Sequence, residues 1–299
     1  MHGLNDTKLN GNGSGPGTFD GEGWHDRRLD LSKHVAVVTG GASGIGRATC
    51  IRLALEGIKA IGVVDMSDKV TAFAEECNQR LGREILIPYR GDVTSTEFRK
   101  SVFADLERRH GSVSICVPAA GITRDRLAVR IDKVTGQVDM YAEEEFRRVI
   151  EIDLTAPIYW GLETVASVAR QRLQSGQKKW EPQEPLSGAI IFIGSVSSTG
   201  NRGQISYATA KAGLEGAEAT MASEAIFYGV RSAIIHPGYT DTAMVRAMGE
   251  QLIGEKILPQ TQLRRLIYPE EIAEAICFMI RNAAVSGTLW ADAGWHPMV

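Results

Sequence analysis

The chain lacks the long apolar runs that a membrane-spanning helix needs. No stretch of its 299 residues approaches the roughly 18–20 consecutive apolar residues of such a helix. Its start, MHGLNDTKLNGNGSGPG, lacks the apolar segment of a secretory signal, so we expect no signal peptide and no membrane association. The 33 Lys and Arg are balanced by 36 Asp and Glu, and no long basic run occurs, which argues against nucleic-acid binding.

Cysteine and histidine are sparse and scattered. The four cysteines (Cys50, Cys77, Cys116 and Cys277) form no CxxC pair, and three of them fall in apolar or helical patterns. This usage is typical of structural thiols in a reducing compartment, so we expect a cytoplasmic protein. The six histidines form no HxxxH or similar cluster, so we expect no protein-held metal.

The chain does contain a regular alternation of strand and helix patterns, which begins after a polar segment. Residues 1–31 are rich in Gly, Asn and Asp without periodicity and predict a flexible tail, with a partner-binding arm as the alternative. Residues 32–299 show no composition break that would mark a second domain. The hydrophobic fraction of 43% is enough for one large core.

Short apolar runs that end in glycine or a polar residue predict buried parallel strands. The expected strands span 35–40, 60–65, 85–93, 113–121, 189–195, 230–238 and 288–294. The expected helices span 46–56, 69–81, 96–109, 142 to beyond 162, a segment ending near 228, and 269–281. This alternation predicts an α/β fold, a single Rossmann-type doubly wound parallel sheet with helices on both faces.

Two segments interrupt the alternation. Residues 130–141 alternate apolar and polar side chains about Thr135-Gly136, which predicts a small hairpin. Residues 174–188 are polar and contain proline, which predicts a surface loop.

The segment TGGASGIG, residues 39–46, follows the first strand and opens the first helix. Glycines at this place permit a tight turn and the close approach of a pyrophosphate, which then sits at the positive end of the helix. The pattern therefore predicts a dinucleotide site.

Asp65 ends the second strand, close to the ~20-residue distance at which an acid meets the adenosine ribose. Its carboxylate would accept hydrogen bonds from the ribose and repel a 2′-phosphate. The two residues after it are not basic, and position 43 in the glycine turn is Ser, so we expect NAD rather than NADP. The alternative is a strand-end Asp that caps a helix. After the third strand, Asp92 and Val93 could hold the adenine.

The segment ISYATAKAG, residues 205–213, places Tyr207 and Lys211 four residues apart. On a helix the two side chains share one face, and the ammonium would lower the pKa of the phenol from about 10. A lowered pKa suits a catalytic acid and base near neutral pH. A Tyr-Lys pair at this spacing is common, and one exposed helix turn is the alternative.

Taken in order, the motifs resemble those of the short-chain dehydrogenases/reductases, and the likeness extends from about Lys33 to the C-terminus. The matching segments are TGGASGIG, Asp92, AAG (119–121), Ser195, YATAK (207–211) and PGYTDT (237–242). The resemblance implies that Tyr207 exchanges a proton with the substrate oxygen. Lys211 would also bind the nicotinamide ribose, and Ser195 would bind the substrate oxygen, while the cofactor carries the hydride.

The same resemblance implies a set of cofactor contacts. The expected residues are Gly40, Ser43, Gly44, Ile45, Gly46, Asp65, Met66, Asp92, Val93, Ala119, Ala120, Gly121, Tyr207, Lys211, Pro237, Gly238, Thr240 and Thr242. Thr242 would bind the nicotinamide carboxamide, or would only cap a helix. Ser195 could instead be a strand-end cap, with Ser197 or Ser198 in its place.

Two departures from the family pattern stand out. Pro118-Ala119 occupies the place of two asparagines, whose amides tie the strand end together in the family. Asp153 replaces an asparagine that helps to hold a water chain to the lysine, largely through its main-chain carbonyl. Asp153 keeps that carbonyl, and its carboxylate could change the charge balance at Lys211. We therefore count Asp153 with the catalytic residues and expect an active enzyme with an altered pH profile.

Residues 120–125 and 265–280 look most like 3-oxoacyl-[acyl-carrier-protein] reductases, which usually prefer NADP and dock an acidic carrier on basic residues. Here Leu186, Ser223 and Tyr228 stand where arginine is common, and only Lys178 and Lys179 remain nearby. We therefore expect an NAD-dependent enzyme that interconverts a secondary alcohol and a ketone, first a 3-hydroxyacyl/3-oxoacyl compound. The alternatives are a polyol, sugar or cyclic alcohol dehydrogenase, or a catalytically impaired nucleotide-binding protein.

Two further expectations concern movement and assembly. Residues 242–263 carry methionines and predict an adaptable lid over the substrate, with plain helix packing as the alternative. By resemblance we expect a homotetramer or homodimer built on helices 146–171 and 208–228 and on the last strand.

Overall fold

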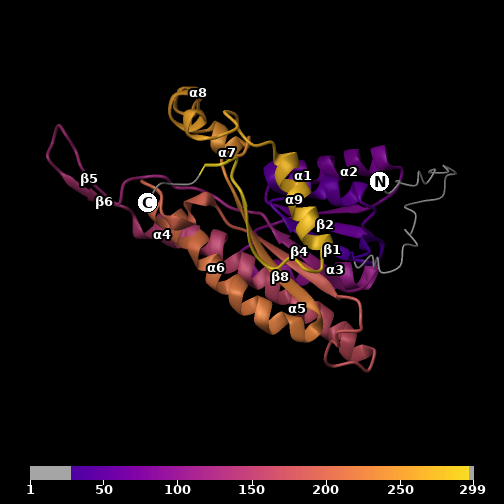
Figure 1. Ribbon diagram of the computed structural model, residues 1–299. Helices are drawn as coiled ribbons and strands as arrows, with labels where there is room; N and C mark the ends of the chain where they lie inside the picture. The colour runs from indigo at the N-terminus through magenta and orange to yellow at the C-terminus, as the bar shows by residue number, and fades with distance from the viewer. Residues whose placement is uncertain (1–27, 296–299) are drawn as a thin grey trace, which may run out of the picture.

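Seven parallel strands form the centre of the molecule, in the order β3-β2-β1-β4-β7-β8-β9 (Figure 1). The computed structural model describes residues 28–295. The strands are β1 (Val35–Thr39), β2 (Ala60–Asp65), β3 (Leu86–Arg90), β4 (Val113–Pro118), β7 (Gly188–Ile193), β8 (Val230–Pro237) and β9 (Gly287–Ala291). The strand order reverses at β1, which lies between β2 and β4. The predicted doubly wound sheet is confirmed.

Helices cover both faces of this sheet. The helices are α1 (Gly44–Leu55), α2 (Lys69–Leu81), α3 (Thr96–His110), α4 (Glu143–Ile150), α5 (Ala156–Gln174), α6 (Ile205–Ala225) and α9 (Pro269–Arg281). Along β1, Ala36 and Val38 join the core with α1, α2 and α9, while Val35 and Val37 join the core with α3, α5 and α6. The strands are buried on both faces, which explains their continuous apolar runs.

A single long helix was expected from residue 142, and the structure divides it. A π-helical turn, Glu151–Thr155, joins α4 to α5. Such a turn holds one residue more than an α-helical turn, and it is a feature often found at functional sites. Asp153 lies in this turn and is fully buried.

The folded domain begins earlier than the predicted tail boundary. Leu29 and Leu31 are buried in the core, and the Leu29 N–H donates to the Arg281 carbonyl at 2.9 Å. Apolar contacts therefore outweigh the polar composition at this end of the predicted tail. Residues 1–27 lie outside the described part of the chain.

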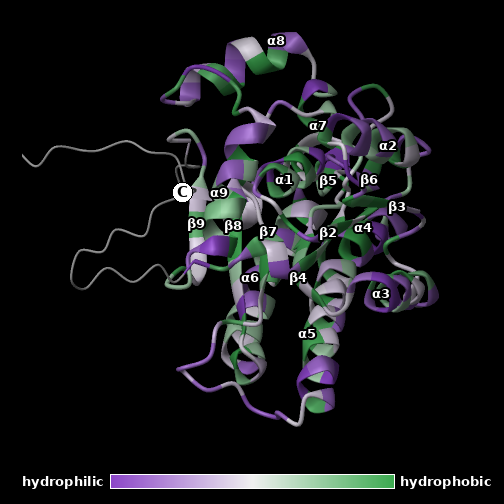
Figure 2. Cartoon of the chain, turned by 90° about the vertical axis from the view of Figure 1, so that its right-hand side faces the viewer, coloured by the Kyte–Doolittle hydropathy of each residue, from purple (hydrophilic) through white to green (hydrophobic). Residues whose placement is uncertain are grey.

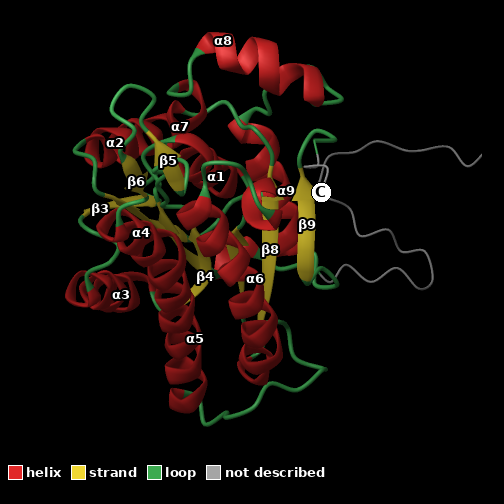
Figure 3. Cartoon of the chain, turned by 90° about the vertical axis from the view of Figure 1, so that its left-hand side faces the viewer, coloured by secondary structure: helices red, strands yellow, loops and turns green. Residues whose placement is uncertain are grey.

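Both predicted interruptions are present. Strands β5 (Val129–Ile131) and β6 (Val138–Met140) form an antiparallel hairpin that projects from the body (Figure 1). The second interruption connects α5 to β7 and lies at the end of the molecule opposite α7 (Ala243–Arg246) and α8 (Glu250–Leu252) (Figure 2, Figure 3). No helix within residues 28–295 is long and apolar enough to cross a membrane.

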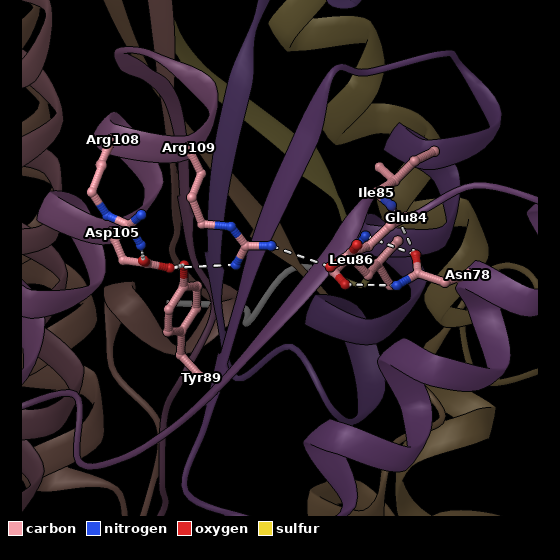
Figure 4. Close-up of polar contacts among 8 residues, drawn as sticks. All are labelled: Asn78, Glu84, Ile85, Leu86, Tyr89, Asp105, Arg108 and Arg109. Carbon is pink, nitrogen blue, oxygen red and sulfur yellow. Dashed lines mark hydrogen bonds and ion pairs between the residues drawn. The ribbon is translucent and has the colours of Figure 1, made fainter.

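Polar side chains tie the outer strand β3 to its two flanking helices (Figure 4). Asn78 of α2 donates to the Leu86 carbonyl at 2.8 Å and accepts the Leu86 N–H at 2.9 Å. Arg109 of α3 pairs with Asp105 at 3.4 Å and reaches Glu84 at 3.2 Å. These contacts occupy polar groups at the open edge of the sheet and fix the start of β3.

Trp160 of α5 generates a stability prediction. Its side chain is fully buried beside Phe103, and Nε1 donates to the Val93 carbonyl at 2.9 Å. We expect Trp160→Ala to lower the free energy of unfolding by about 3–5 kcal/mol in equilibrium urea denaturation, because it leaves a cavity and an unpaired carbonyl. Phe278→Ala, at a half-exposed position of α9, is the control and should cost less than about 1 kcal/mol. Equal losses would contradict this account.

Candidate active site

A groove opens at the carboxyl edge of the sheet, where the strand order reverses. The glycine turn between β1 and α1 lies so close to the end of β4 that a Cβ on Gly40 would sit 2.8 Å from the Ala120 main chain. A Cβ on Gly46 would sit 2.3 Å from the Gly40 carbonyl oxygen. Only glycine fits at these two positions. The turn leads directly into α1, whose first N–H groups form a positive end suited to a pyrophosphate.

Two hydrogen bonds to Thr39, one to its carbonyl and one to its hydroxyl, hold the end of β4. The Ala119 N–H donates to the Thr39 carbonyl at 3.2 Å, and the Ala120 N–H donates to Thr39 Oγ1 at 3.1 Å. The end of β4 is therefore held without the two amides. Their loss does not open the groove.

Asp65 holds the glycine turn against the end of β2. One carboxylate oxygen accepts the Ala42 N–H at 3.0 Å, and the other accepts the Ser67 N–H at 2.9 Å. The residue at the N-cap position of α2 is Asp68, so the helix-cap alternative for Asp65 is wrong. The carboxylate borders the groove, where it can meet a ribose.

The structure brings nearly all the predicted cofactor residues to this groove. Those that line it are Gly40, Ser43, Gly44, Ile45, Gly46, Asp65, Met66, Asp92, Val93, Ala119, Ala120, Gly121, Tyr207, Lys211 and Thr242. Pro237, Gly238 and Thr240 line an adjoining cleft with Ser195. Tyr207 and Thr242 border both spaces, so the cleft meets the groove at the predicted catalytic tyrosine.

Three predicted catalytic side chains converge at that junction. Ser195 follows β7 and lines the cleft together with Tyr207 of α6. Lys211, one turn along α6, has only 4% of its surface exposed, and its Nζ lies 5.4 Å from the centre of the Tyr207 ring. Nζ also donates to the Ile193 carbonyl at 3.0 Å, which fixes the ammonium beneath the groove.

The charge environment of Tyr207 differs from the expectation. Burial raises the pKa of the phenol above its ordinary value, and the attraction of the Lys211 ammonium opposes that rise without overcoming it. The lysine therefore acts in the predicted direction, but the predicted net lowering is wrong. Desolvation is the larger effect, and the sequence carried no measure of it.

The substrate cleft contains polar side chains that the sequence analysis did not assign. Asp125 accepts from Gln204 Nε2 at 2.8 Å, and both line the cleft. Behind the cleft, His236 is fully buried, with its Nδ1 between the Ser195 N–H at 3.1 Å and the Ser195 carbonyl at 3.0 Å. The His236 ring stacks on Trp290 at 4.3 Å. These contacts join residues far apart in the chain, so no local sequence pattern predicts them.

The predicted lid folds into short helical turns beside the cleft. Met244, Val245 and Met248 line the cleft, and Val245 and Met248 also pack against a small apolar cluster of Ile253, Ile257 and Leu266. The same side chains therefore line the cleft and pack within the fold, and the movement of a lid stays a prediction.

Thr242, at the start of this segment, is placed to cap a helix and also borders the predicted cofactor groove. Its hydroxyl lies at the N-terminus of α7, 3.5 Å from the Val245 N–H. A Cβ on Gly44 would lie 3.0 Å from its methyl group, so Thr242 also stands against the glycine turn.

Lys178 and Lys179 are not near the site, contrary to expectation. They lie in the loop that precedes β7, whereas Ser195 follows the other end of β7. In a parallel sheet these ends lie at opposite edges, and Figure 3 places the loop far from α7. These lysines cannot flank the catalytic residues.

Within residues 28–295 no group of three metal-ligating side chains occurs. A glycine cradle at the positive end of a helix, next to a tyrosine with a buried lysine and a buried serine, defines a dinucleotide-dependent oxidoreductase. The cradle fits a nicotinamide dinucleotide, since its glycines leave room for a pyrophosphate and its far end carries the carboxylate of Asp65.

Comparison with known proteins agrees. A family model described as short chain dehydrogenase matches residues 34–253. The chain is 32% identical over 273 residues to the 3-oxoacyl-[acyl-carrier-protein] reductase FabG of Escherichia coli (strain K12), covering 90% of this chain and 99% of that protein. It is 33% identical over 268 residues to the acetoacetyl-CoA reductase of Rhizobium meliloti (strain 1021), covering 88% and 98%. The chain belongs to the short-chain dehydrogenase/reductase family.

A solved structure shows the same fold. It is a short-chain type dehydrogenase/reductase from Mycobacterium marinum, with a TM-score of 0.76 and 22% sequence identity. The match covers 90% of this chain and 98% of that one. Family membership makes the protein an oxidoreductase with a nicotinamide cofactor.

The cradle yields a binding prediction. We expect Gly46→Ala to weaken NADH binding by at least about tenfold in a fluorescence titration, because its methyl group would collide with the Gly40 carbonyl. Gly216→Ala is the matched control, since nothing lies within 4 Å of its Cβ position, and it should bind NADH like the unmodified protein. Unchanged affinity in Gly46→Ala would show that the turn does not carry the dinucleotide.

Proposed function

We propose that the protein is an NAD-dependent oxidoreductase that interconverts a secondary alcohol and a ketone. The observation that carries the proposal is the junction of groove and cleft at Tyr207, where Ser195 lines the cleft beside the phenol and the buried Lys211 Nζ lies 5.4 Å from the centre of the phenol ring. A bound nicotinamide dinucleotide would supply or accept the hydride. In reduction Tyr207 gives a proton to the substrate oxygen, and in oxidation it takes one, while Ser195 holds that oxygen.

The preference for NAD rests on the charges along the groove. Asp65 borders its adenosine end, and Lys211, at the catalytic end, is the only lysine or arginine that lines the groove within the described residues. A 2′-phosphate would therefore meet a carboxylate and no compensating cation. The sheet neighbour Arg90 directs its guanidinium to the Met66 carbonyl at 3.4 Å instead.

For the substrate we propose an uncharged reacting segment, with a 3-oxoacyl or 3-hydroxyacyl thioester as the leading class. Asp125 is the only Asp, Glu, Lys or Arg that lines the cleft within the described chain, and it would repel a free carboxylate. A 3-oxoacyl thioester is named in both relatives quoted above, which supports the same class. Polyols, sugars and cyclic alcohols are also uncharged and form the second candidate class.

Docking of an acyl carrier protein finds little support. The positions of Leu186, Ser223 and Tyr228 carry no charge, and Lys178 and Lys179 lie at the opposite edge of the sheet. We therefore propose a coenzyme-bound or otherwise small thioester. The cytoplasmic location expected from the cysteine pattern stays a prediction.

Turnover measured by nicotinamide absorbance tests the proposal. We expect NAD-selective activity on at least one member of a panel of 3-hydroxyacyl thioesters, polyols and cyclic alcohols, with the matching ketones in reverse. Tyr207→Phe should lose at least about 100-fold in kcat, the size of one acid–base contribution, and still bind NADH. Tyr159→Phe, at a half-exposed tyrosine on α5, is the matched control and should keep its activity. Saturable NADH binding without any turnover would favour the impaired binding protein, and selectivity for NADP would contradict the role of Asp65.

We further propose that the chain forms a homotetramer or homodimer. Tyr159, Leu162 and Leu173 of α5 are large apolar side chains that stand exposed on one helix. Burying such a surface between copies is favourable. We expect size-exclusion chromatography with light scattering to give a mass of two or four chains, and a monomer would contradict the proposal.

A further inference from the structure

The buried carboxylate of Asp153 has no role in the fold that would require a charge. It belongs to the π-helical turn Glu151–Thr155, and none of its surface is exposed. Oδ1 accepts the Ile122 N–H at 2.9 Å, which a neutral amide oxygen could do equally well. Oδ2 lies 3.5 Å from Lys211 Nζ and has no other partner within the described chain.

Close packing keeps Oδ2 of Asp153 near the ammonium of Lys211. A Cβ on Gly121 would lie 2.8 Å from Oδ2, so only glycine at that position lets the carboxylate sit against the end of β4. Lys211 is held in turn by the Ile193 carbonyl at 3.0 Å. The carboxylate and the ammonium thus lie 3.5 Å apart with almost no exposed surface, where opposite charges are screened less than at the protein surface.

Lys211 consequently serves two partners. Its ammonium lies 5.4 Å from the ring centre of Tyr207 on one side and 3.5 Å from Asp153 on the other. In the expectation drawn from the sequence, the ammonium acts only on the phenol of Tyr207. In this chain the carboxylate offsets part of that charge.

We propose that Asp153 is a positioning residue that acts through Lys211 and makes Tyr207 hold its proton to a higher pH than the lysine alone would allow. The inference rests on the proposed function, because it concerns the acid–base group of that reaction. The consequence is a shift of the pH ranges of the two reaction directions. The phenol stays available as an acid for carbonyl reduction over a wider alkaline range, while alcohol oxidation, which needs the phenolate, gains rate only at higher pH.

The other charged groups around Asp153 and Lys211 do not reverse the upward effect of Asp153 on the pKa of Tyr207. Asp125, in the loop after β4, also raises the pKa of Tyr207, more weakly than Asp153 does. His236 of β8 lies beyond Lys211, and burial lowers the pKa of its imidazole, which keeps the ring neutral near pH 7. Glu215 of α6 faces His236 at 3.6 Å and is half-exposed.

Burial acts on both partners of Lys211, and the lysine opposes its effect at each. Burial raises the pKa of the Asp153 carboxyl, and the Lys211 ammonium opposes that rise. Burial raises the pKa of the Tyr207 phenol, Lys211 opposes it, and the Asp153 carboxylate adds to it. Removal of the carboxylate should therefore lower the pKa of Tyr207.

The test is a titration of Tyr207 itself, which needs no substrate. The full chain is labelled with ¹³Cζ-tyrosine, and its seven tyrosine signals are followed by NMR from neutral to alkaline pH, with Tyr207→Phe to assign the signal. We expect Asp153→Asn, which keeps an oxygen for the Ile122 N–H and removes the charge, to lower the Tyr207 midpoint by about one pH unit or more. The rising, low-pH limb of kcat/KM for alcohol oxidation should move to lower pH by the same amount.

Glu151→Gln is the matched control, because Glu151 is an exposed carboxylate of the same π-helical turn. It should leave the Tyr207 midpoint unchanged. Asp153→Ser, a second neutral replacement that keeps an oxygen, stands in if Asp153→Asn does not fold, and the same downward shift is expected.

The outcomes separate the inference from the proposed function. An unchanged or raised Tyr207 midpoint in the neutral variants would overturn the inference even if the enzyme turns over its substrate. An equal shift in Glu151→Gln would also overturn it, because the effect would then be the general loss of one negative charge. A lowered midpoint without turnover of any alcohol or ketone would support the inference and count against the proposed function.

Discussion

The close approach of two main-chain segments, the glycine turn after β1 and the end of β4, is the constraint on which the site depends. A side chain at Gly40 would push the turn off Ala120, and a side chain at Gly46 would push the start of α1 off the turn itself. The groove exists because neither position carries a side chain. It lies where the strand order reverses, so β1 and β4 send their following segments to opposite faces of the sheet and leave a gap between them.

From that gap the catalytic groups follow by connectivity. β7 lies beside β4 and is followed by Ser195, and the next long helix, α6, returns Tyr207 and Lys211 over the same edge. β8 then places His236 directly beneath the Ser195 main chain. The chemistry is therefore assembled from consecutive strand ends, each of which is rigid because its strand is buried on both faces.

The sequence predicted what local patterns and chain order determine. Apolar runs and helical periods gave the sheet and its layers, and the glycine turn, Tyr207 and Lys211 could be located because each carries a spacing that chemistry requires. It could not show that burial outweighs Lys211 at the phenol, because desolvation depends on every element packed around Tyr207. Nor could it show that the Thr39 hydroxyl holds the end of β4, since that contact joins positions 81 residues apart. The misplaced Lys178 has a similar cause, because a loop length does not state which edge of the sheet the loop occupies.

Trp295, at the end of the described chain, contacts both the cleft and the predicted lid, residues 242–263. The Trp295 ring meets the Tyr239 ring edge-on at 5.1 Å, and its Nε1 donates to Gln260 at 3.1 Å. Tyr239 lines the cleft, and Gln260 belongs to the lid segment. Leu29, at the other end of the described chain, is anchored to Arg281, at the edge of the sheet where β1 begins. The last described residue is therefore tied to the wall of the cleft, whereas the first described residues are tied to the opposite edge of the sheet.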